Sequence, residues 1–508
     1  MAATETLDTR LHTWARETPR QTFLVSPETR RTLSYGELHD FRQRLAAHYD
    51  AHGIAAGDAV AMLLGNGLAA AALFIGTMAS ARVIVPLNLL SQGAQLAYTI
   101  EHCDCRLVWT SAEHEARVRE AVRGIDRAIE VCVIDPDSTD WLARASASSD
   151  TQAGADDIAL LMYTSGTTGR PKGALLSHAN LLHAAGNVAR WHSLTPADRV
   201  LSALPLYHIN GQVIATLTPF VSGGSIVAPR RFSVSTWWAL ATEHRCTWLN
   251  MVPTIIAYLL NAAADDPAGT ASIRRRITGI RFGRSASAPL PAEHHRAFEA
   301  LFGLPVIEAM GMTESASVVF CNPMPPARSR IGSPGLPLGV QARVVDAQGH
   351  ELPDGQQGEI LLRGANVMRG YYKAPEQSRD AFDGTDWLRT GDLGHRDADG
   401  FYFITGRLKE LIIKGGENIA PREIDEALLR HPAVLEAAAV GIADPNYGQE
   451  ILACVVLRDG MRCSADELRG FCERELGRYK TPREFRFVAE LPKGPSGKVQ
   501  RLRLSEAG

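Results

Sequence analysis

The chain has 508 residues, more than one hydrophobic core normally supports, so we expect two or more domains. Its 53 lysines and arginines nearly balance 56 aspartates and glutamates, which leaves a formal net charge of −3. This balance gives no reason to expect a nucleic acid or an anionic membrane surface as a partner.

No stretch of the sequence has the character of a targeting or membrane-spanning segment. Met1 to Arg20 is polar and lacks the apolar core of a signal peptide. The most apolar stretch, Leu68 to Ala81, is shorter than the roughly 20 residues of a membrane span and precedes Arg82, so we expect a buried helix and then a strand, Val83 to Val85. Eight scattered cysteines show no zinc-type spacing. We therefore expect reduced thiols and a cytoplasmic protein.

Residues 1 to 150 alternate helical and strand patterns, which is typical of an α/β protein. Ser34 and Glu37 have the spacing of a capping box, so a helix is predicted to begin just after Ser34. Ala59 to Leu64 reads as a buried strand, with Asn66 opening the helix that follows. Ala145 to Gly154 is predicted to be an exposed connector.

A strand at Ile158 to Met162 leads into a loop in which hydroxyl residues alternate with glycine, and Lys172 follows. Glycine lets backbone N–H groups approach an oxyanion closely, so the loop is predicted to bind phosphate. It is not a Walker loop, because the lysine follows Arg170-Pro171. A plain solvated turn is the alternative, and the ordered run from Tyr163 to Gly173 argues against it.

Further strand ends are predicted to line one cleft. A helix at Asn180 to His192 and a strand at Val200 to Leu204 precede His208, although a lone histidine at a strand end is more often structural than functional. Trp248 to Thr254 and Arg281 to Leu290 read as two more strand ends.

The last third reads as short strands and a small terminal unit. Glycine-punctuated strands from Gly332 to Tyr372 suggest a β-rich subdomain. Ile412 to Ile419 predicts a strand and tight turn before a helix at Glu423 to Arg430. Leu491 to Arg501 is a loop that presents Lys493 and Lys498, and lysines in such loops are normally only solubilising.

The run Tyr163 to Gly173 resembles the signature loop of the adenylate-forming superfamily of acyl-CoA synthetases, luciferases and peptide-synthetase adenylation domains. Val306 to Glu314, Ile412 to Ile419 and the Gly-Lys-Val-x-Arg frame around Lys498 resemble other segments of that superfamily. The resemblance implies an α/β fold with a large N-terminal domain of stacked αβ subdomains and a small β subdomain, followed by a mobile α+β C-terminal domain. It places the ATP and acyl sites in residues 1–408, the lid in residues 409–508, and the hinge at Lys409.

The resemblance also implies roles for individual residues. As catalytic residues it gives Lys498, Thr313 and His208. As metal ligands it gives Glu314 and Thr168. As substrate residues it gives His208, Asn210, Asn250, Arg284 and Gly311. As cofactor-binding residues it gives Thr164, Ser165, Gly166, Thr167, Thr168, Gly169, Lys172, Ser287, Ala288, Pro289, Glu308, Ala309, Met310, Gly311, Met312, Thr313, Asp392, Ile404, Arg407, Lys414, Gly415, Gly416 and Lys498.

Met310 departs from the family pattern, because most relatives place there a tyrosine that stacks on adenine. A methionine can still lie against a ring through its polarizable sulfur. The departure bears on ATP affinity and leaves the reaction type unchanged.

The resemblance implies an acid–CoA ligase that uses ATP, Mg²⁺ and CoA, forms an acyl-adenylate with release of pyrophosphate, and then a CoA thioester. His208, where peptide-synthetase domains commonly carry an aspartate, argues against an amino-acid substrate. No carrier module follows Gly508, so CoA is the expected acceptor, and a free-standing domain that loads a carrier protein stays open. A non-enzymatic nucleotide-binding protein is the rival class, and intact Lys498, Glu314 and Asp392 speak against it. A homodimer is a further expectation.

The segment from Leu204 to Pro289 most resembles synthetases of small acids such as oxalate, malonate or sulfoacetate. Arg284, Asn210 and Asn250 near His208 are predicted to hold a second anionic group by charge-assisted hydrogen bonds. The alternative is that Arg284 is structural and satisfies backbone carbonyls. A medium-chain fatty acid or an aryl acid also stays open, because pocket depth cannot be read from the sequence.

Overall fold

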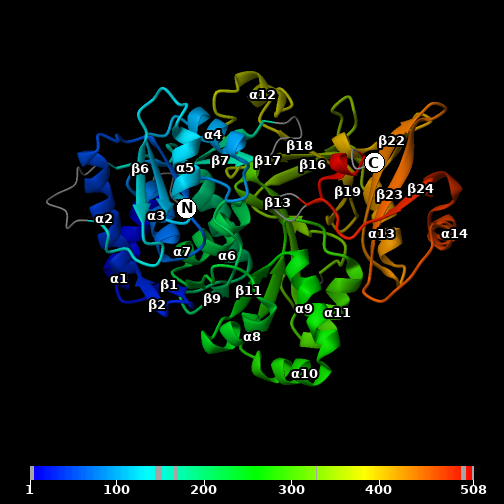
Figure 1. The fold of residues 1–508 in the computed structure, drawn as a ribbon, viewed down its shortest axis with the longest axis horizontal. Helices are drawn as coiled ribbons and strands as arrows, with labels where there is room; N and C mark the ends of the chain where they lie inside the picture. Colours follow the sequence, from blue (N-terminus) through cyan, green and yellow to red (C-terminus); the bar gives the residue numbers. More distant parts are fainter. Residues whose placement is uncertain (1–4, 143–151, 165–169, 328, 494–498, 506–508) are drawn as a thin grey trace. The chain divides into compact units, whose positions relative to one another are not determined.

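The computed structural model describes residues 5–142, 152–164, 170–327, 329–493 and 499–505. The chain forms two compact units (Figure 1). The first contains Met1–Ile331, Gly335–Gln341 and Arg363–Asp386, and the second contains Gly332–Pro334, Ala342–Leu362 and Trp387–Gly508. Helices and sheets alternate, so the predicted α/β class is confirmed. Within the described part of the chain, no helix is both long and apolar enough to span a membrane.

The two strands that flank the predicted phosphate loop, β7 and β8, belong to a six-stranded sheet in the first unit. Its strand order is β6-β5-β3-β4-β7-β8, parallel except for the antiparallel pair β7 and β8. Its strands are β3 (Ala59–Leu63), β4 (Val83–Pro86), β5 (Leu107–Ser111), β6 (Glu130–Ile134), β7 (Ile158–Thr164) and β8 (Lys172–Ser177).

A nine-stranded sheet carries the other predicted strand ends. Its order is β15-β14-β13-β12-β11-β9-β10-β1-β2, and the run from β13 to β1 is parallel. Its strands are β1 (Thr22–Ser26), β2 (Arg31–Ser34), β9 (Arg199–Leu201), β10 (Ser225–Val227), β11 (Trp248–Met251), β12 (Phe282–Ser285), β13 (Val306–Met312), β14 (Ser317–Cys321) and β15 (Leu336–Pro337).

Helices cover these sheets, and α8 to α11 pack together beside β11 (Figure 1). The first unit contains α1 (Leu7–Glu17), α2 (Tyr35–Ala51), α3 (Leu68–Ala79), α4 (Gly93–His102), α5 (Glu115–Val122), α6 (His178–Trp191), the π-helix η1 (Asn210–Leu217), α7 (Thr218–Ser222), α8 (Val234–Glu243), α9 (Pro253–Asp265), α10 (Pro267–Arg276), α11 (Ala292–Phe302), the 3₁₀ turn η2 (Thr313–Ser315) and α12 (Pro375–Asp380).

Local sequence signals set the helix starts. Ser34 caps α2 and exchanges hydrogen bonds with Glu37, as the capping-box spacing predicted. Helix α3 is buried at every position, which confirms the buried helix expected there. It begins at Leu68 behind Gly67, two residues after the predicted start at Asn66. The predicted connector at 145–154 lies mostly outside the described residues.

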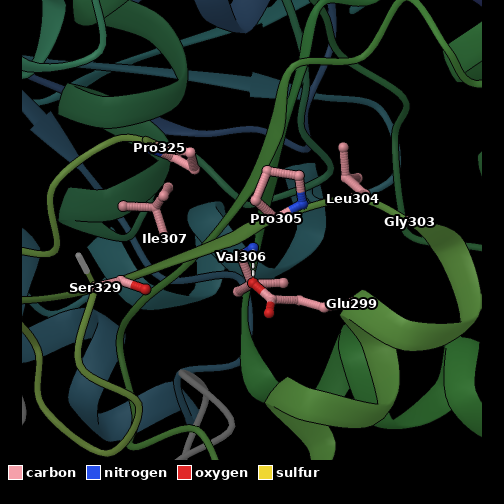
Figure 2. Close-up of a pocket in the computed structure, with 8 residues that line it drawn as sticks. All are labelled: Glu299, Gly303, Leu304, Pro305, Val306, Ile307, Pro325 and Ser329. Carbon is pink, nitrogen blue, oxygen red and sulfur yellow. Dashed lines mark hydrogen bonds between the residues drawn. The ribbon is translucent and has the colours of Figure 1, made fainter. Parts of the chain in front are cut away.

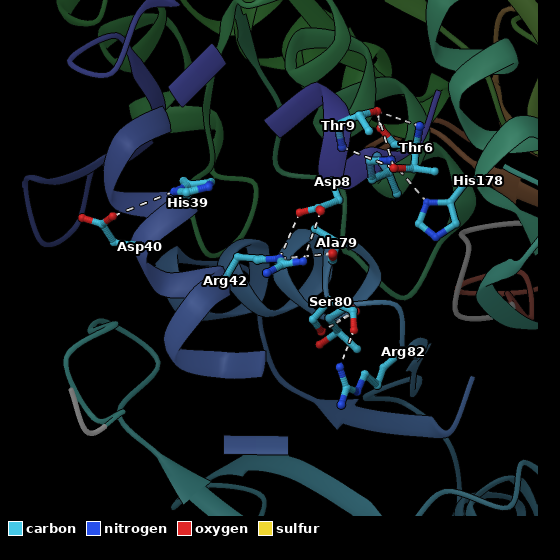
Figure 3. A network of polar contacts seen from close by, with 12 residues as sticks. Thr6, Asp8, Thr9, His39, Asp40, Arg42, Ala79, Ser80, Arg82 and His178 are labelled. Atoms are coloured by element: carbon cyan, nitrogen blue, oxygen red, sulfur yellow. Dashed lines mark hydrogen bonds and ion pairs between the residues drawn. The ribbon is translucent and has the colours of Figure 1, made fainter. Parts of the chain in front are cut away.

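The N-terminal helix α1 is tied to the core by buried polar contacts (Figure 3). Arg42 donates from Nε to Asp8 Oδ1 at 2.9 Å and to the Ala79 carbonyl at 3.2 Å. The Leu7 backbone N–H donates to His178 Nδ1 at 3.3 Å. Burial lowers the pKa of His178 from 6.5 to about 4, so its imidazole is neutral and accepts this hydrogen bond at neutral pH.

The second unit contains two sheets. A four-stranded antiparallel sheet has the order β16-β17-β18-β19, and a five-stranded sheet has the order β21-β20-β23-β22 with β24 against β23. The elements are β16 (Gln341–Val345), β17 (Gly358–Arg363), β18 (Leu388–Arg396), β19 (Tyr402–Arg407), η3 (Leu408–Glu410), β20 (Ile412–Lys414), β21 (Glu417–Ile419), α13 (Pro421–Leu429), β22 (Val434–Asp444), β23 (Gly448–Leu457), α14 (Ala465–Leu476), η4 (Arg478–Lys480), β24 (Glu484–Phe487) and α15 (Arg501–Leu504).

The predicted strand, tight turn and helix after residue 411 are confirmed. Gly415 and Gly416 form the turn between β20 and β21 with φ of 55° and 86°, values that side chains other than glycine seldom adopt. Ile412, Ile424 and Val455 belong to one buried core with α13 and α14 packed on it. The predicted domain boundary after residue 408 falls between the two sheets of this unit and stays a prediction.

Replacing His178 tests whether its neutrality sets part of the acid stability. The unfolded chain takes up a proton at His178 below pH 6.5, whereas the folded chain does so only near pH 4. The free energy of unfolding therefore falls as the pH drops through this window, by up to about 3 kcal/mol from this group. We expect His178→Gln to be less stable at neutral pH but to lose less stability on acidification, measured as urea midpoints.

His183→Gln is the matched control, because His183 lies on the same helix and makes an exposed contact with the Gly339 carbonyl. It should follow the wild-type pH dependence. An unchanged pH dependence in His178→Gln would contradict this account of acid stability.

Candidate functional site

The predicted phosphate loop leaves the six-stranded sheet between β7 and β8. Thr164 and Lys172 are register partners on these antiparallel strands, and the Thr164 hydroxyl donates to the Lys172 carbonyl at 3.5 Å. The phenolic oxygen of Tyr163 lies 2.7 Å from His102 Nδ1 and anchors the strand end. The predicted residues Ser165, Gly166, Thr167, Thr168 and Gly169 lie outside the described residues.

Lys172 meets a second predicted site residue, Glu314, through a tyrosine that the sequence analysis did not single out. The Lys172 ammonium lies 5.0 Å from the centroid of the Tyr371 ring. The Tyr371 hydroxyl donates to Glu314 Oε1 at 2.9 Å. The only trace of this tyrosine in the sequence is the pair Tyr371-Tyr372 after Gly370, a pattern that predicts a short strand and no site residue.

Glu314 fits the predicted metal role, because one of its oxygens is oriented and the other has no hydrogen bond within the described chain. The described residues contain no group of three or more His, Cys, Asp or Glu that could hold a metal ion. One carboxylate that acts together with phosphate oxygens is the usual arrangement for Mg²⁺. Thr313 precedes Glu314 in the same 3₁₀ turn, η2.

The segment from Glu308 to Met312 forms the end of β13, where β14 crosses it closely. A Cβ on Gly311 would lie 1.8 Å from the Ser317 carbonyl oxygen, so only glycine fits. Ala309 and Met310 pair with Cys321 and Phe320 in the same ladder. The predicted adenine-contacting segment is therefore a strand whose path depends on Gly311.

The loop after β12 is tied to this strand. Glu308 Oε1 accepts a hydrogen bond from the Leu290 backbone N–H at 3.2 Å, next to the predicted cofactor residues Ala288 and Pro289. Ser287 has a φ of 75°, in the left-handed region that non-glycine residues seldom occupy. Such strained residues cluster at ligand sites.

Three predicted site residues form a chain of hydrogen bonds. Asn250 Nδ2 donates to Asn210 Oδ1 at 3.0 Å, and Asn210 Nδ2 donates to Ser287 Oγ at 3.0 Å. Asn210 opens the π-helix η1, a conformation found frequently at functional sites. His208 is half-buried two residues earlier, with its ring centroid 4.7 Å from that of Tyr207. The structure thus brings Asn210 and Asn250, two of the predicted acyl residues, together with Ser287.

Arg284 is the register partner of Asn250 on the neighbouring parallel strand, so the two side chains share one face of the sheet. Its side chain is fully buried, with 0% exposure. Nε and both terminal nitrogens make no well-formed hydrogen bond within the described residues, and the neutral Cys321 thiol is a polar side chain that interacts with the guanidinium. Among the described residues, no backbone carbonyl accepts a hydrogen bond from Arg284, which is what the structural alternative requires.

The groups beside Arg284 do not balance its charge. Burial raises the pKa of the Cys321 thiol to about 11, although Arg284 acts to lower it. Burial, and then the charges of Arg284 and Arg281, hold the pKa of His192 well below its usual value. Both groups are therefore neutral at physiological pH, and the described residues leave the buried guanidinium without a counter-ion.

The second unit contains the predicted ribose residues. Asp392 and Arg407 are register partners on β18 and β19, and Arg407 Nε lies 2.8 Å from Asp392 Oδ1. Asp392 is buried, whereas Arg407 is partly exposed. Ile404 lies on the same strand β19 and accepts a hydrogen bond from Arg422 through its carbonyl at 2.6 Å. The three residues that the resemblance grouped together lie close in the fold.

The other predicted residues of this unit surround the turn at Gly415 and Gly416. Lys414 pairs with Glu450 and donates to the Tyr479 carbonyl at 3.0 Å, which holds the start of the turn. Lys409 lies in the short turn η3. Lys498 lies outside the described residues, and its flanking residues Lys493 and Val499 form an antiparallel bridge.

Figure 2 shows a separate cavity of about 360 Å³ at the amino end of β13. Glu299 accepts a hydrogen bond from the Val306 backbone N–H there at 2.8 Å. Ligands of open parallel sheets bind at the carboxyl ends of the strands, where Glu308 to Glu314 lie. This cavity is therefore not the predicted site.

Comparison with known proteins agrees with this geometry. Residues 11–372 match the family described as AMP-binding enzyme, and residues 423–498 match the AMP-binding enzyme C-terminal domain. The chain is 56% identical over 504 residues to a protein named sulfoacetate–CoA ligase from Cupriavidus necator, covering 98% of this chain and 97% of that one.

Solved structures of two related enzymes are similar to this chain over nearly its full length. ATP-bound MatB from Rhodopseudomonas palustris superposes with a TM-score of 0.91 at 31% identity, covering 99% of this chain and 98% of the other. MenE from Bacillus subtilis in complex with ATP and a magnesium ion has a TM-score of 0.86 at 30% identity, with 97% and 98% covered. The chain therefore belongs to the AMP-binding enzyme family, within the adenylate-forming superfamily, as an AMP-forming acid–CoA ligase that uses ATP, Mg²⁺ and CoA.

Proposed function

We propose that the acid activated by this ligase is a small carboxylic acid with a second, permanently charged anionic group, and that sulfoacetate is its substrate. One observation carries the proposal. Arg284 is a fully buried guanidinium that has no well-formed hydrogen bond and no anionic partner among the described residues, next to the polar chain through Asn250 and Asn210.

A lone buried charge is costly, because removal from water leaves its donors unsatisfied. A sulfonate has three acceptor oxygens and stays ionised at every pH at which the enzyme works. Its hydrogen bonds to Arg284 would be charge-assisted and in a water-poor site, where such bonds are strong. The substrate would thus supply the negative charge that Cys321 and His192 do not supply.

The sequence relationship supports the same acid, because the relative at 56% identity is named a sulfoacetate–CoA ligase. The predicted departure from peptide synthetases fits as well. His208 stands where peptide synthetases commonly carry an aspartate that holds an α-amine, so an amino-acid substrate is disfavoured.

The reaction proceeds in two displacements. An oxygen of the substrate carboxylate bonds to the α-phosphorus of ATP as the bond to the bridging oxygen of pyrophosphate breaks. The CoA sulfur then bonds to the acyl carbon, AMP leaves, and the thiol proton is released. The protein mainly positions the reactants and neutralises charge.

The described residues divide these tasks. Thr164 and Lys172 would hold the departing pyrophosphate, and Thr313 the α-phosphate. Glu314 would hold Mg²⁺, which neutralises the charge of the phosphate oxygens when it is bound. Asp392 and Arg407 would hold the ribose hydroxyls.

We further propose that residues 409–508 form the mobile lid domain, with Lys409 as the hinge and Lys498 as the lysine that bridges the carboxylate and the α-phosphate. A phosphate-facing lysine would obstruct the thiol in the second step. Withdrawal of the lid, which brings Gly415 and Gly416 toward CoA, would relieve this obstruction. A cytoplasmic location and a homodimer belong to the same proposal.

Arg284→Met tests the substrate. The variant keeps side-chain volume and removes the charge, so kcat/KM for sulfoacetate should fall by a factor on the order of 10² to 10³. The free energy of unfolding without substrate should stay equal or rise, because an uncompensated buried charge has been removed. Thioester formation from sulfoacetate, oxalate, octanoate and benzoate, together with urea unfolding, measures both effects.

Arg281→Met is the matched control, since Arg281 pairs with Asp198 at 2.8 Å. It should lower stability and leave the order of preferred acids unchanged. A wild-type preference for octanoate or benzoate over the dianions would contradict the proposal that the substrate is a small acid with a second anionic group. A large loss of stability in Arg284→Met would show that the arginine is structural.

Lys498→Ala tests the two-step division of labour. The variant should lose formation of the acyl-adenylate, measured as pyrophosphate release, by at least about 10²-fold, because a charge-stabilising group of the transition state is missing. Thioester formation from synthetic acyl-AMP should stay near the wild-type rate. Equal loss of both steps would contradict the two-conformation account.

A further inference from the structure

We infer that Tyr371 is a positioning residue that keeps the metal-binding carboxylate and the phosphate-binding lysine apart and correctly aimed. The inference rests on the proposed roles of Glu314 in holding Mg²⁺ and of Lys172 in holding phosphate. Tyr371 contacts both side chains, through its hydroxyl on one and through its ring on the other.

The backbone around Tyr371 is fixed independently of these contacts. The Tyr371 N–H donates to Ser378 Oγ at 2.8 Å, and Tyr371 forms an antiparallel bridge with Ala174 on β8. On either side, the Leu175 N–H donates to the Gly370 carbonyl at 2.9 Å and the Tyr372 N–H to the Gly173 carbonyl at 2.8 Å. The ring is therefore held from the same strand that carries Lys172.

The segment is also pinned to the turn that carries Glu314. The Met368 N–H donates to the Glu314 carbonyl at 2.8 Å, and Asn366 Nδ2 donates to the Ser315 carbonyl at 2.9 Å. The backbone positions of Lys172, Tyr371 and Glu314 are thus mutually determined, which a positioning role requires.

The hydroxyl acts only as a donor toward Glu314. A phenol is protonated at neutral pH and an ionised carboxylate can only accept, so Tyr371 is the donor of this hydrogen bond. Its hydrogen bond to Oε1 at 2.9 Å fixes the carboxylate and leaves Oε2 for a cation. Orienting partners of metal ligands typically contribute about 10- to 100-fold in metal affinity.

The aromatic ring of Tyr371 contacts Lys172 and keeps this lysine from pairing with Glu314. Lys172 and Glu314 carry opposite charges and both contact Tyr371, yet the described contacts include no ion pair between them. The aromatic face attracts the ammonium at 5.0 Å, whereas the hydroxyl occupies the carboxylate. Each charge thereby stays available for its own part of MgATP instead of neutralising the other.

Tyr371→Phe removes the hydroxyl and keeps the ring. We expect its dissociation constant for Mn²⁺, measured by electron paramagnetic resonance in the presence of α,β-methylene-ATP, to rise about 10- to 100-fold. Tyr371→Leu removes the ring as well and should also weaken binding of the nucleotide analogue without metal. Excess Mn²⁺ should restore pyrophosphate release in Tyr371→Phe.

Tyr372→Phe is the matched control, because Tyr372 is the adjacent tyrosine and its hydroxyl donates to another carboxylate, Asp104 Oδ2, at 2.7 Å. It should bind Mn²⁺ as the wild type does. Glu314→Gln tests the proposed metal role of Glu314 separately from the positioning role of Tyr371. Wild-type Mn²⁺ affinity in Glu314→Gln would overturn the proposed metal role itself. Weak affinity in Glu314→Gln with wild-type affinity in Tyr371→Phe would overturn only the inference about Tyr371.

Discussion

The constraint behind the proposed substrate site is the buried positive charge of Arg284, for which the described residues supply no counter-ion. A guanidinium cannot shed its proton in a protein, so burial cannot neutralise it as burial neutralises His192. The position of Arg284 on β12, beside Asn250 on β11, keeps it within the sheet interior rather than at a solvated edge. A ligand anion is the missing partner that such a site would accept, and a sulfonate meets the requirement at every working pH.

Strand direction explains why residues far apart in the sequence share the site. Strands β11, β12 and β13 are parallel, so their carboxyl ends meet at one edge and place Asn250, Ser287 and Glu308 close together. The antiparallel β14 then crosses β13 so closely that only Gly311 fits. Phosphate-loop strands β7 and β8 belong to the other sheet of the same unit, and the segment at Tyr371 links β8 to Glu314.

The sequence predicted those features that depend on local order. The capping box at Ser34 and the buried helix from Leu68 were predictable because their signals lie within a few residues. Family resemblance paired Asp392 with Arg407, which the ladder of β18 and β19 brings together. The role of Tyr371 could not be predicted, because it depends on a hydrogen bond across 57 residues.

The lack of a well-formed hydrogen bond at Arg284 could not be predicted from the sequence either. It becomes evident only when the positions of the neighbouring described residues are known. Asp392 and Arg407, by contrast, are two charges of the protein that contact each other at 2.8 Å. At the proposed sites for charged ligands, Arg284, Lys172 and Glu314 form no ion pair among the described residues. Tyr371 contacts Lys172 through its ring and Glu314 through its hydroxyl, whereas the Cys321 and His192 side chains beside Arg284 are neutral. A counter-ion from the protein beside Arg284 would compete with the anionic group of the proposed substrate.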